Sequence, residues 1–214
     1  MATQRGTVFT ISAPSGAGKT SLVKALLERD EQLQVSVSHT TRPMRAGEID
    51  GVNYHFVSDS EFRAMTAQQA FVEYAEVFGY WYGTSAEAIN TARADNTDII
   101  LEIDWQGAEQ IKAVWPEACA IFILPPSHRT LEQRLEGRGQ DSPAVIQQRL
   151  AEAEQEMSHY TIADYLVVND VFEDALNGIR NIIGAERLRT DRQAIALQAL
   201  LCDLMPSTAL RNPE

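Results

Sequence analysis

The stretch that decides the fold reads Ala13-Pro14-Ser15-Gly16-Ala17-Gly18-Lys19-Thr20. Residues 7–11 before it are β-branched and aromatic, which predicts a strand, and from Lys19 onward apolar residues recur at helical spacing. Glycines between a strand and a helix let backbone N–H groups face a polyphosphate, while the helix N-terminus and Lys19 add positive charge. The hydroxyl of Thr20 would be a ligand of Mg²⁺. The stretch therefore predicts a loop that binds a nucleoside triphosphate together with magnesium.

The stretch departs from the usual phosphate-loop pattern at one position. Ala13 stands where the pattern has glycine, so the first turn must accommodate a methyl group. A glycine-rich turn that contains a lysine by chance is the alternative. The order of strand, loop and helix favours the phosphate loop.

Further buried strands are predicted at 98–103, 120–124 and 165–168, where the sequence is almost continuously apolar. Helical stretches separate these runs. This alternation is typical of a parallel sheet covered by helices on both faces. The sequence therefore predicts an α/β fold with a phosphate-loop type of parallel-sheet core.

Two segments interrupt this alternation, and we interpret both as insertions into the core. Residues 38–84 are rich in aromatic side chains and predict short strands with a helix or two, whereas residues 127–160 look helical throughout. Ser127 can cap one helix that ends near 137–139, and Ser142-Pro143 can begin the next. Towards the C-terminus, 193–205 predicts one amphipathic helix, followed by a polar tail. We expect this helix to dock on its own core, with pairing to a second copy in a homo-oligomer as the alternative.

Composition excludes several classes of protein. The 214 residues include 18 Lys+Arg and 30 Asp+Glu, a net charge of −12, which argues against a nonspecific nucleic-acid binder. Cys119 and Cys202 lack metal-ligand spacing and indicate reduced thiols rather than a disulfide framework. No apolar run approaches the ~20 residues of a membrane span, and no signal peptide is visible. We expect a cytoplasmic protein with no membrane partner.

The segment 38–56 carries a second candidate phosphate site. Arg42 and Arg45, in a loop fixed by proline and glycine, can converge on one phosphate as planar forks, and Tyr54 can add a hydroxyl donor. The alternative is a pair of solvated surface arginines. The spacing alone leaves the two interpretations open.

At this point the motifs are recognisable, because the chain resembles the bacterial guanylate kinase family from about Gly6 to Leu188. The motifs occur in the family's order and spacing, and the segment 40–56 is highly specific to it. They are the loop 13–20, the segment 40–56, Phe71-Val72-Glu73-Tyr74-Ala75-Glu76, Tyr82-Gly83-Thr84, Asp104-Trp105-Gln106-Gly107, Arg134-Leu135-Glu136-Gly137-Arg138-Gly139 and Val168-Asn169-Asp170.

The resemblance implies a fold of three parts and a reaction. The reaction is ATP + GMP ⇌ ADP + GDP and depends on Mg²⁺. The implied guanylate-kinase-like domain spans 5–185, with a core of 5–37, 90–126 and 161–190, a GMP-binding insertion at 38–89 and a helical lid at 127–160. Residues 191–214 form the C-terminal helix and tail.

The resemblance also implies roles for individual residues. The phosphate of GMP falls to Ser38, Arg42, Arg45, Tyr54 and Tyr82, and the guanine to Glu73, Thr84 and Asp104. ATP falls to Ala13, Pro14, Ser15, Gly16, Ala17, Gly18, Lys19, Thr20, Arg134, Arg138 and Asn169, and the catalytic charges are Lys19, Arg42, Arg134, Arg138 and Arg149.

The chemistry of guanine agrees with this assignment, because its ring N–H and exocyclic amine are donors that paired carboxylates can accept. From the residues alone, Glu73 would be read as a solvated charge and Asp104 as a magnesium ligand. Whether Glu102 or Asp104 lies nearer the metal stays open. Arg134 and Arg138 are four residues apart, so they share a helical face if the helix continues to Gly137. The alternative is an exposed helix on which these arginines pair with Glu132 and Glu136.

Two other functions remain as alternatives. A phosphate-loop kinase with another phosphorylated acceptor, such as a ribosyl bisphosphate, would not need Glu73, Thr84 and Asp104 together. A non-catalytic interaction module of similar fold would not need an intact phosphate loop, and Lys19 and Thr20 argue against it.

Overall fold

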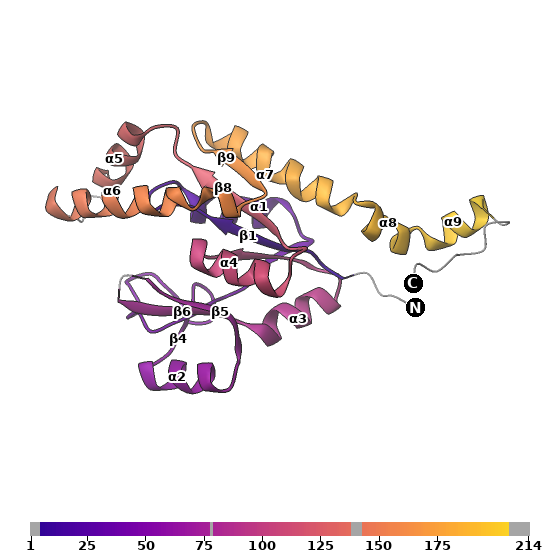
Figure 1. The fold of residues 1–214 in the computed structure, drawn as a ribbon, viewed down its shortest axis with the longest axis horizontal. Helices are drawn as coiled ribbons and strands as arrows, with labels where there is room; N and C mark the ends of the chain where they lie inside the picture. Colours follow the sequence, from indigo (N-terminus) through magenta and orange to yellow (C-terminus); the bar gives the residue numbers. More distant parts are fainter. Residues whose placement is uncertain (1–4, 78, 138–142, 206–214) are drawn as a thin grey trace.

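The computed structural model describes residues 5–77, 79–137 and 143–205. Its centre is a sheet of β1 (Val8–Ser12), β2 (Leu33–Val35), β7 (Asp98–Glu102), β8 (Cys119–Leu124) and β9 (Tyr165–Val168). The strand order is β2-β7-β1-β8-β9, and every neighbouring pair is parallel. Figure 1 labels β1, β8 and β9 of this sheet. The predicted α/β class is confirmed, and the predicted strands differ from these by one residue at most at either end. The sequence did not predict β2.

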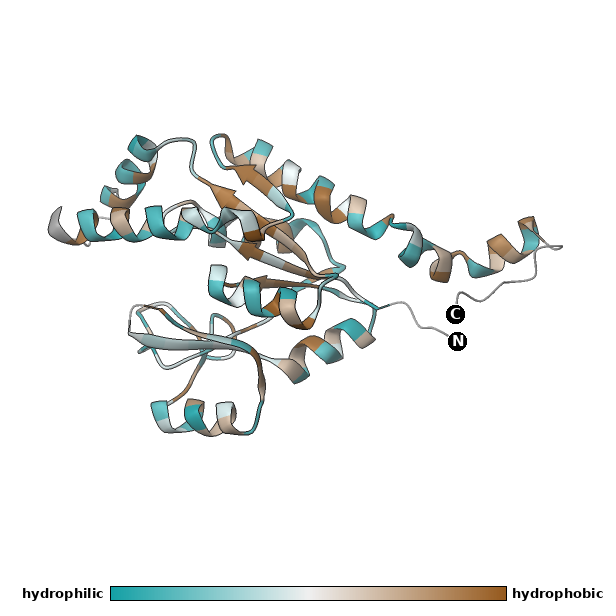
Figure 2. Ribbon diagram, in the orientation of Figure 1, coloured by the Kyte–Doolittle hydropathy of each residue, from teal (hydrophilic) through white to brown (hydrophobic). Residues whose placement is uncertain are grey.

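Helices cover both faces of this sheet, as the apolar runs predicted. Phe9 and Ile11 of β1 point into a core shared with α1 (Lys19–Arg29) and α7 (Phe172–Arg187). Val8 points the other way, into a core shared with α3 (Ala86–Ala94) and α4 (Trp105–Val114). Figure 2 shows hydrophobic strands at the centre and helices in which hydrophobic and hydrophilic residues alternate. Side chains that alternate along one strand thus build two separate cores.

The aromatic segment folds as a second, smaller sheet that lies below the core in Figure 1. Its strands are β3 (His39–Thr40), β4 (His55–Phe56), β5 (Phe71–Val77) and β6 (Tyr80–Ser85), in the order β4-β3-β6-β5. Helix α2 (Asp59–Ala67) begins with a capping box made by Ser58 and Glu61, and its Phe62 stacks on Phe71. The prediction of short strands with a helix is therefore correct.

The segment after β8 is mostly helical where it is described. It contains α5 (His128–Glu136), α6 (Pro143–Ser158) and the 3₁₀ turn η1 (Tyr160–Ile162). Ser127 caps α5 by accepting a hydrogen bond from Thr130 N, as predicted. Leu131 and Leu135 pack against Leu150 and Ala153 in a third apolar cluster. Arg138 and Ser142 lie outside the described residues, so the shared face of Arg134 and Arg138 stays a prediction.

The prediction for the C-terminus is wrong in two respects. Instead of one helix at 193–205 there are two short ones, α8 (Thr190–Ala196) and α9 (Gln198–Leu204). Arg192 of α8 still bonds to Thr7 and Asp98 of the core, whereas α9 extends away from the core (Figure 1). Neither helix has a buried residue, and Leu197, Leu200 and Leu204 are exposed. Apolar periodicity shows which face of a helix is apolar, but it does not provide a surface to cover that face.

The structure also bears on disulfide bonds and on membrane-spanning helices. Both cysteines are free thiols, Cys119 buried and Cys202 exposed, as their spacing predicted. Across the described ranges, we find no helix with the length and apolar character needed to span a membrane.

Candidate active site

The phosphate loop lies at the carboxyl end of β1, where parallel sheets commonly place their ligand sites. Gly16 and Gly18 have φ of 91° and 94°, a left-handed conformation that favours glycine. Gly18 is the N-cap of α1, so the loop leads directly into the helix N-terminus. Lys19 Nζ donates a hydrogen bond of 3.0 Å to the carbonyl oxygen of Ile103, beyond the end of β7. The loop therefore has the geometry that the glycine pattern predicted.

A hydroxyl and a carboxylate lie together beside the loop. Thr20 Oγ1 donates a hydrogen bond to Glu102 Oε1 at the end of β7. Both groups offer oxygen atoms, which Mg²⁺ prefers, and this metal commonly uses only one or two protein ligands and completes its shell with water and phosphate. The described residues contain no group of three or more His, Cys, Asp or Glu placed to hold a metal. The pair therefore fits a nucleotide-associated Mg²⁺ better than a metal site built by the protein alone.

Asp104 has a different role from Glu102 in this structure. It is the N-cap of α4, where its Oδ1 accepts from Gly107 N at 2.9 Å and its Oδ2 from Gln106 Nε2 at 3.0 Å. Thus the carboxylate beside Thr20 is that of Glu102. Burial raises the pKa of Glu73, and the negative charge of Asp104 adds to this rise, so the two carboxyl groups lie close enough to interact electrostatically.

Glu73 is the most deeply buried carboxylate of the predicted site, with 4% of its surface exposed. Thr84 Oγ1 donates a hydrogen bond to Glu73 Oε1, and Ser38 Oγ lies 3.3 Å from Thr84 Oγ1. Burial raises the pKa of Glu73 to about 7, since a charged carboxylate loses its hydration there. A Cβ on Gly107 would lie 2.6 Å from Glu73 Oε2, so glycine is what allows α4 to approach this closely.

Arg42 is held in a fixed orientation by a carboxylate that sequence reasoning missed. Its Nη2 and Nη1 donate to the two carboxylate oxygens of Glu48 at 2.7 and 3.1 Å, and its guanidinium lies over the ring of Tyr54. Arg42 is 7% exposed, and the hydrogen bond to Glu48 raises its pKa. The backbone N–H of Arg45, an exposed residue, also donates to Glu48. The alternative of two solvated arginines is therefore wrong for Arg42.

The two predicted tyrosines lie beside this arginine. The rings of Tyr54 and Tyr82 are 5.8 Å apart between centroids, and the guanidinium of Arg42 lies 5.4 Å from the centroid of the Tyr54 ring. Burial raises the pKa of Tyr54 to about 12, and the charge of Glu102 in the core adds to this effect. Tyr54 in the inserted segment therefore lies close enough to the core for the charge of Glu102 to affect it.

Two residues predicted to bind ATP, Asn169 and Arg134, contact the loop and each other in this structure. Asn169 Nδ2 donates a hydrogen bond of 2.7 Å to the carbonyl oxygen of Ala17, and Arg134 Nη2 donates one of 2.9 Å to the carbonyl oxygen of Asn169. Asn169 is buried, and Arg134 Nη1 is a buried nitrogen with no hydrogen-bond partner among the described residues. Arg134 therefore turns toward the loop rather than toward Glu132. Arg149 is half-buried on α6.

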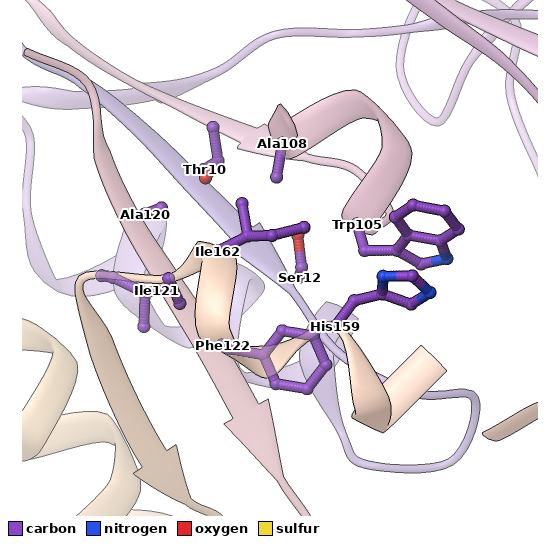
Figure 3. A pocket seen from close by; sticks show the side chains of 10 residues that line it. Thr10, Ser12, Trp105, Ala108, Ala120, Ile121, Phe122, His159 and Ile162 are labelled. Carbon is purple, nitrogen blue, oxygen red and sulfur yellow. The ribbon is translucent and has the colours of Figure 1, made fainter. Parts of the chain in front are cut away.

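Residues near α4 and α6 complete the site, and sequence reasoning assigned none of them a role. Figure 3 shows the ring of His159 facing the indole of Trp105, with centroids 3.5 Å apart and planes 1° from parallel. Glu156 Oε2 accepts a hydrogen bond of 3.1 Å from the backbone N–H of Ser15 in the phosphate loop. No local pattern identifies these contacts, because they join segments far apart in the chain.

The fold places a glycine-rich loop at the carboxyl end of a parallel sheet, with a smaller inserted sheet beside it, which is the architecture of a phosphate-loop kinase. A family model described as guanylate kinase matches residues 5–186. A guanylate kinase of Hahella chejuensis is 55% identical over 203 residues, which cover 95% of this chain and 98% of that protein. A guanylate kinase of Shewanella oneidensis is 54% identical over 95% of this chain and 99% of that protein. The chain belongs to the guanylate kinase family, as its motifs predicted.

Solved structures agree with this membership. The structure of guanylate kinase from Anaplasma phagocytophilum matches with a TM-score of 0.78 and 33% identity, over 95% of this chain and 97% of that one. The SH3-kinase fragment of tight junction protein 3 matches with a TM-score of 0.50 and 8% identity, over 88% of this chain and 60% of that one. The second likeness concerns the fold alone.

Proposed function

We propose that this protein transfers the γ-phosphoryl group of ATP to GMP and so forms ADP and GDP. The observation that carries the proposal is the buried carboxylate of Glu73, which is joined to Thr84 and lies within electrostatic reach of both Asp104 and the phosphate-loop Lys19. In the part of the chain that the structure describes, no lysine or arginine forms an ion pair with this buried carboxylate. Its burial is explained if a ligand brings hydrogen-bond donors to it.

Guanine brings those donors, and adenine does not bring the same ones. The ring N–H and exocyclic amine of guanine can donate to the carboxylates of Glu73 and Asp104, with Thr84 adding a hydroxyl. Adenine would turn an acceptor nitrogen toward the same carboxylates and leave them unpaired. A site that depends on hydrogen bonds can reject such an analogue by up to ~10⁴–10⁵.

The phosphate of GMP is assigned to the neighbouring group of Ser38, Arg42, Arg45, Tyr54 and Tyr82. The pairing of Arg42 with Glu48 supports this assignment, since it fixes a guanidinium fork before substrate arrives. Less rotational freedom is then lost on binding.

The donor phosphates are assigned to the loop 13–20, with Lys19 directed at the transferred group and Arg134, Arg138 and Arg149 supplying further positive charge. Phosphoryl transfer depends on such charge around the three equatorial oxygens. Thr20 and Glu102 would hold Mg²⁺, which neutralises phosphate charge when bound. Asn169 is assigned to shaping the loop, because its amide already donates to the loop backbone. The parts 38–89 and 127–160 would then be the GMP-binding insertion and the lid.

The alternatives lack comparable support. A ribosyl bisphosphate acceptor offers no base donors to the Glu73 pocket, and the likeness to the tight junction fragment shows a shared fold without bearing on catalysis. Two free thiols and intracellular substrates favour a cytoplasmic location.

The test is a coupled ADP-release assay in which GMP, AMP, UMP and CMP are offered separately. We expect activity with GMP and little with the others. Glu73→Gln keeps the shape but introduces a donor, so kcat/KM should fall for GMP and the gap to AMP should narrow. Arg42→Ala is the matched control, because it removes a phosphate contact common to both acceptors and should lower both alike. Equal losses for GMP and AMP in Glu73→Gln would show that Glu73 does not read the base.

A further inference from the structure

One carboxylate of helix α6 reaches the phosphate loop. The backbone N–H of Ser15 donates its hydrogen bond to Glu156 Oε2, and the two residues are 141 positions apart in the sequence. This N–H belongs to the loop that we assign to the phosphates of ATP. A phosphate oxygen and the Glu156 carboxylate cannot both accept the same N–H in the same place. Nucleotide binding and the Glu156 contact therefore compete.

The charges around Glu156 support such competition. Glu156 is half-buried, and burial raises the pKa of its carboxyl. The positive charge of Lys19 acts in the opposite direction, while the negative charges of Asp104 and Glu152 reinforce the rise. The carboxylate of Glu156 therefore interacts electrostatically with Lys19, the residue that we assign to the transferred phosphoryl group. A polyphosphate that enters this field meets a negative charge already present there.

Contacts on either side hold the helical segment against the core. Leu131 of α5 lies so close to the loop that its Cδ1 would be 3.0 Å from a Cβ on Gly16. Beyond the other end of α6, His159 stacks on Trp105, the first residue of α4 (Figure 3). Glu156 lies between these two contacts in the chain. Its bond to Ser15 therefore belongs to the docked position of the segment and is not a chance contact of a loose side chain.

We propose that Glu156 is a positioning residue of the donor site whose carboxylate occupies the place of a nucleotide phosphate on the Ser15 amide and leaves when ATP binds. The inference rests on the assignment of the loop to ATP. Binding of ATP then exchanges one acceptor for another, so Glu156 weakens donor affinity. The same exchange releases the end of α6 from the loop and couples the position of this helix to the donor nucleotide.

The experiment measures dissociation constants by calorimetry, without GMP, for Mg-ATP, inorganic tripolyphosphate and adenosine. Glu156→Ala should bind Mg-ATP and tripolyphosphate about tenfold more tightly, the lower end of what one hydrogen bond to a charged group is worth. Glu156→Gln keeps an acceptor but loses the charge, so its gain should be smaller. Adenosine binding should not change in either variant, because adenosine carries no phosphate. Glu152→Gln is the matched control, since Glu152 is a neighbouring carboxylate whose bond is to Gln148 of its own helix.

The outcomes separate the possible roles of Glu156. Unchanged or weaker binding of tripolyphosphate in Glu156→Ala would overturn the inference and make Glu156 a support of the loop. An equal gain in Glu152→Gln would also overturn it, because overall charge would then explain the effect. If Glu156→Ala does not fold, the near-isosteric Glu156→Gln carries the test. Failure of the unmodified protein to bind either phosphate compound would instead contradict the donor-site assignment on which the inference rests.

Discussion

Replacing Glu73 by glutamine should make the folded protein more stable at alkaline pH and less able to bind GMP. The carboxyl of Glu73 has its pKa raised by burial from the ordinary value of 4.5 to about 7. Between these values the unfolded chain is ionised at Glu73 while the folded chain keeps the proton. Stability therefore falls as pH rises through this window, and it stays lowered above pH 7.

The size of the effect follows from the same two pKa values. At ~1.4 kcal/mol per pKa unit, ionised Glu73 costs the fold about 3 kcal/mol above pH 7. Glu73→Gln removes that cost but adds an amide N–H₂ that needs acceptors, so we expect a net gain of about 1–2 kcal/mol at pH 8. At pH 5 most of the difference should vanish, because the folded wild-type carboxyl is then already neutral.

The assay is urea unfolding of both proteins at pH 5 and pH 8. Glu76→Gln is the matched control, since Glu76 is an exposed carboxylate on the same strand and its loss should have the same small effect at both pH values. GMP affinity provides the second readout. The hydrogen-bond donors of guanine favour the ionised carboxylate, so the GMP affinity of the wild type should rise with pH up to about 7. The GMP phosphate also titrates, but it affects both proteins equally, so the rise due to Glu73 is the difference between the wild type and Glu73→Gln. A stability change of equal size at pH 5 and pH 8 would refute the raised pKa and the reasoning built on it.

Three further predictions concern catalysis, closure and stability. Lys19→Met should lower kcat by about 10²–10³ with GMP binding largely kept, and near-normal turnover would contradict the phosphate-loop assignment. Small-angle scattering should show contraction when both nucleotides or a two-substrate mimic bind, and an unchanged radius would indicate a preformed site. Asp98→Ala should lower the free energy of unfolding by about 3–5 kcal/mol, because buried Asp98 pairs with Arg187 and Arg192. The exposed Glu28→Ala control should cost less than about 1 kcal/mol, and equal losses would show that the Asp98 pairs contribute little.

Local patterns were enough to predict most of the core. Continuous apolar runs such as 120–124 can be buried on both sides only in a sheet with helices on each face, and glycine at 16 and 18 specifies the loop conformation. Strand β2 escaped prediction because it has only three residues and buries just one of them, Leu33. The C-terminal helices escaped it because an apolar stripe does not say what it packs against.

The site was predictable only where its residues lie in a recognisable motif. Residues such as Arg42 and Glu73 belong to motifs, so the resemblance located them. Glu48 lies within the recognisable segment 40–56 but was assigned no role, and Glu156 meets the loop only through the tertiary fold. A carboxylate in a loop or on a helix is usually solvated, so its sequence alone gives no reason to assign it a contact.

Several of the polar groups that we assign to the substrates already have a partner within the protein. Lys19 donates to a backbone carbonyl, Thr20 to Glu102, Thr84 to Glu73, and the Ser15 amide to Glu156. Substrate binding therefore exchanges hydrogen bonds and adds few new ones, and an exchanged bond contributes modestly to affinity. Such exchange favours the ligand that can replace every displaced partner at once. A molecule that supplies phosphate but not guanine, or guanine but not phosphate, leaves some of these groups unpaired, so selectivity arises from the partners that the substrate must displace.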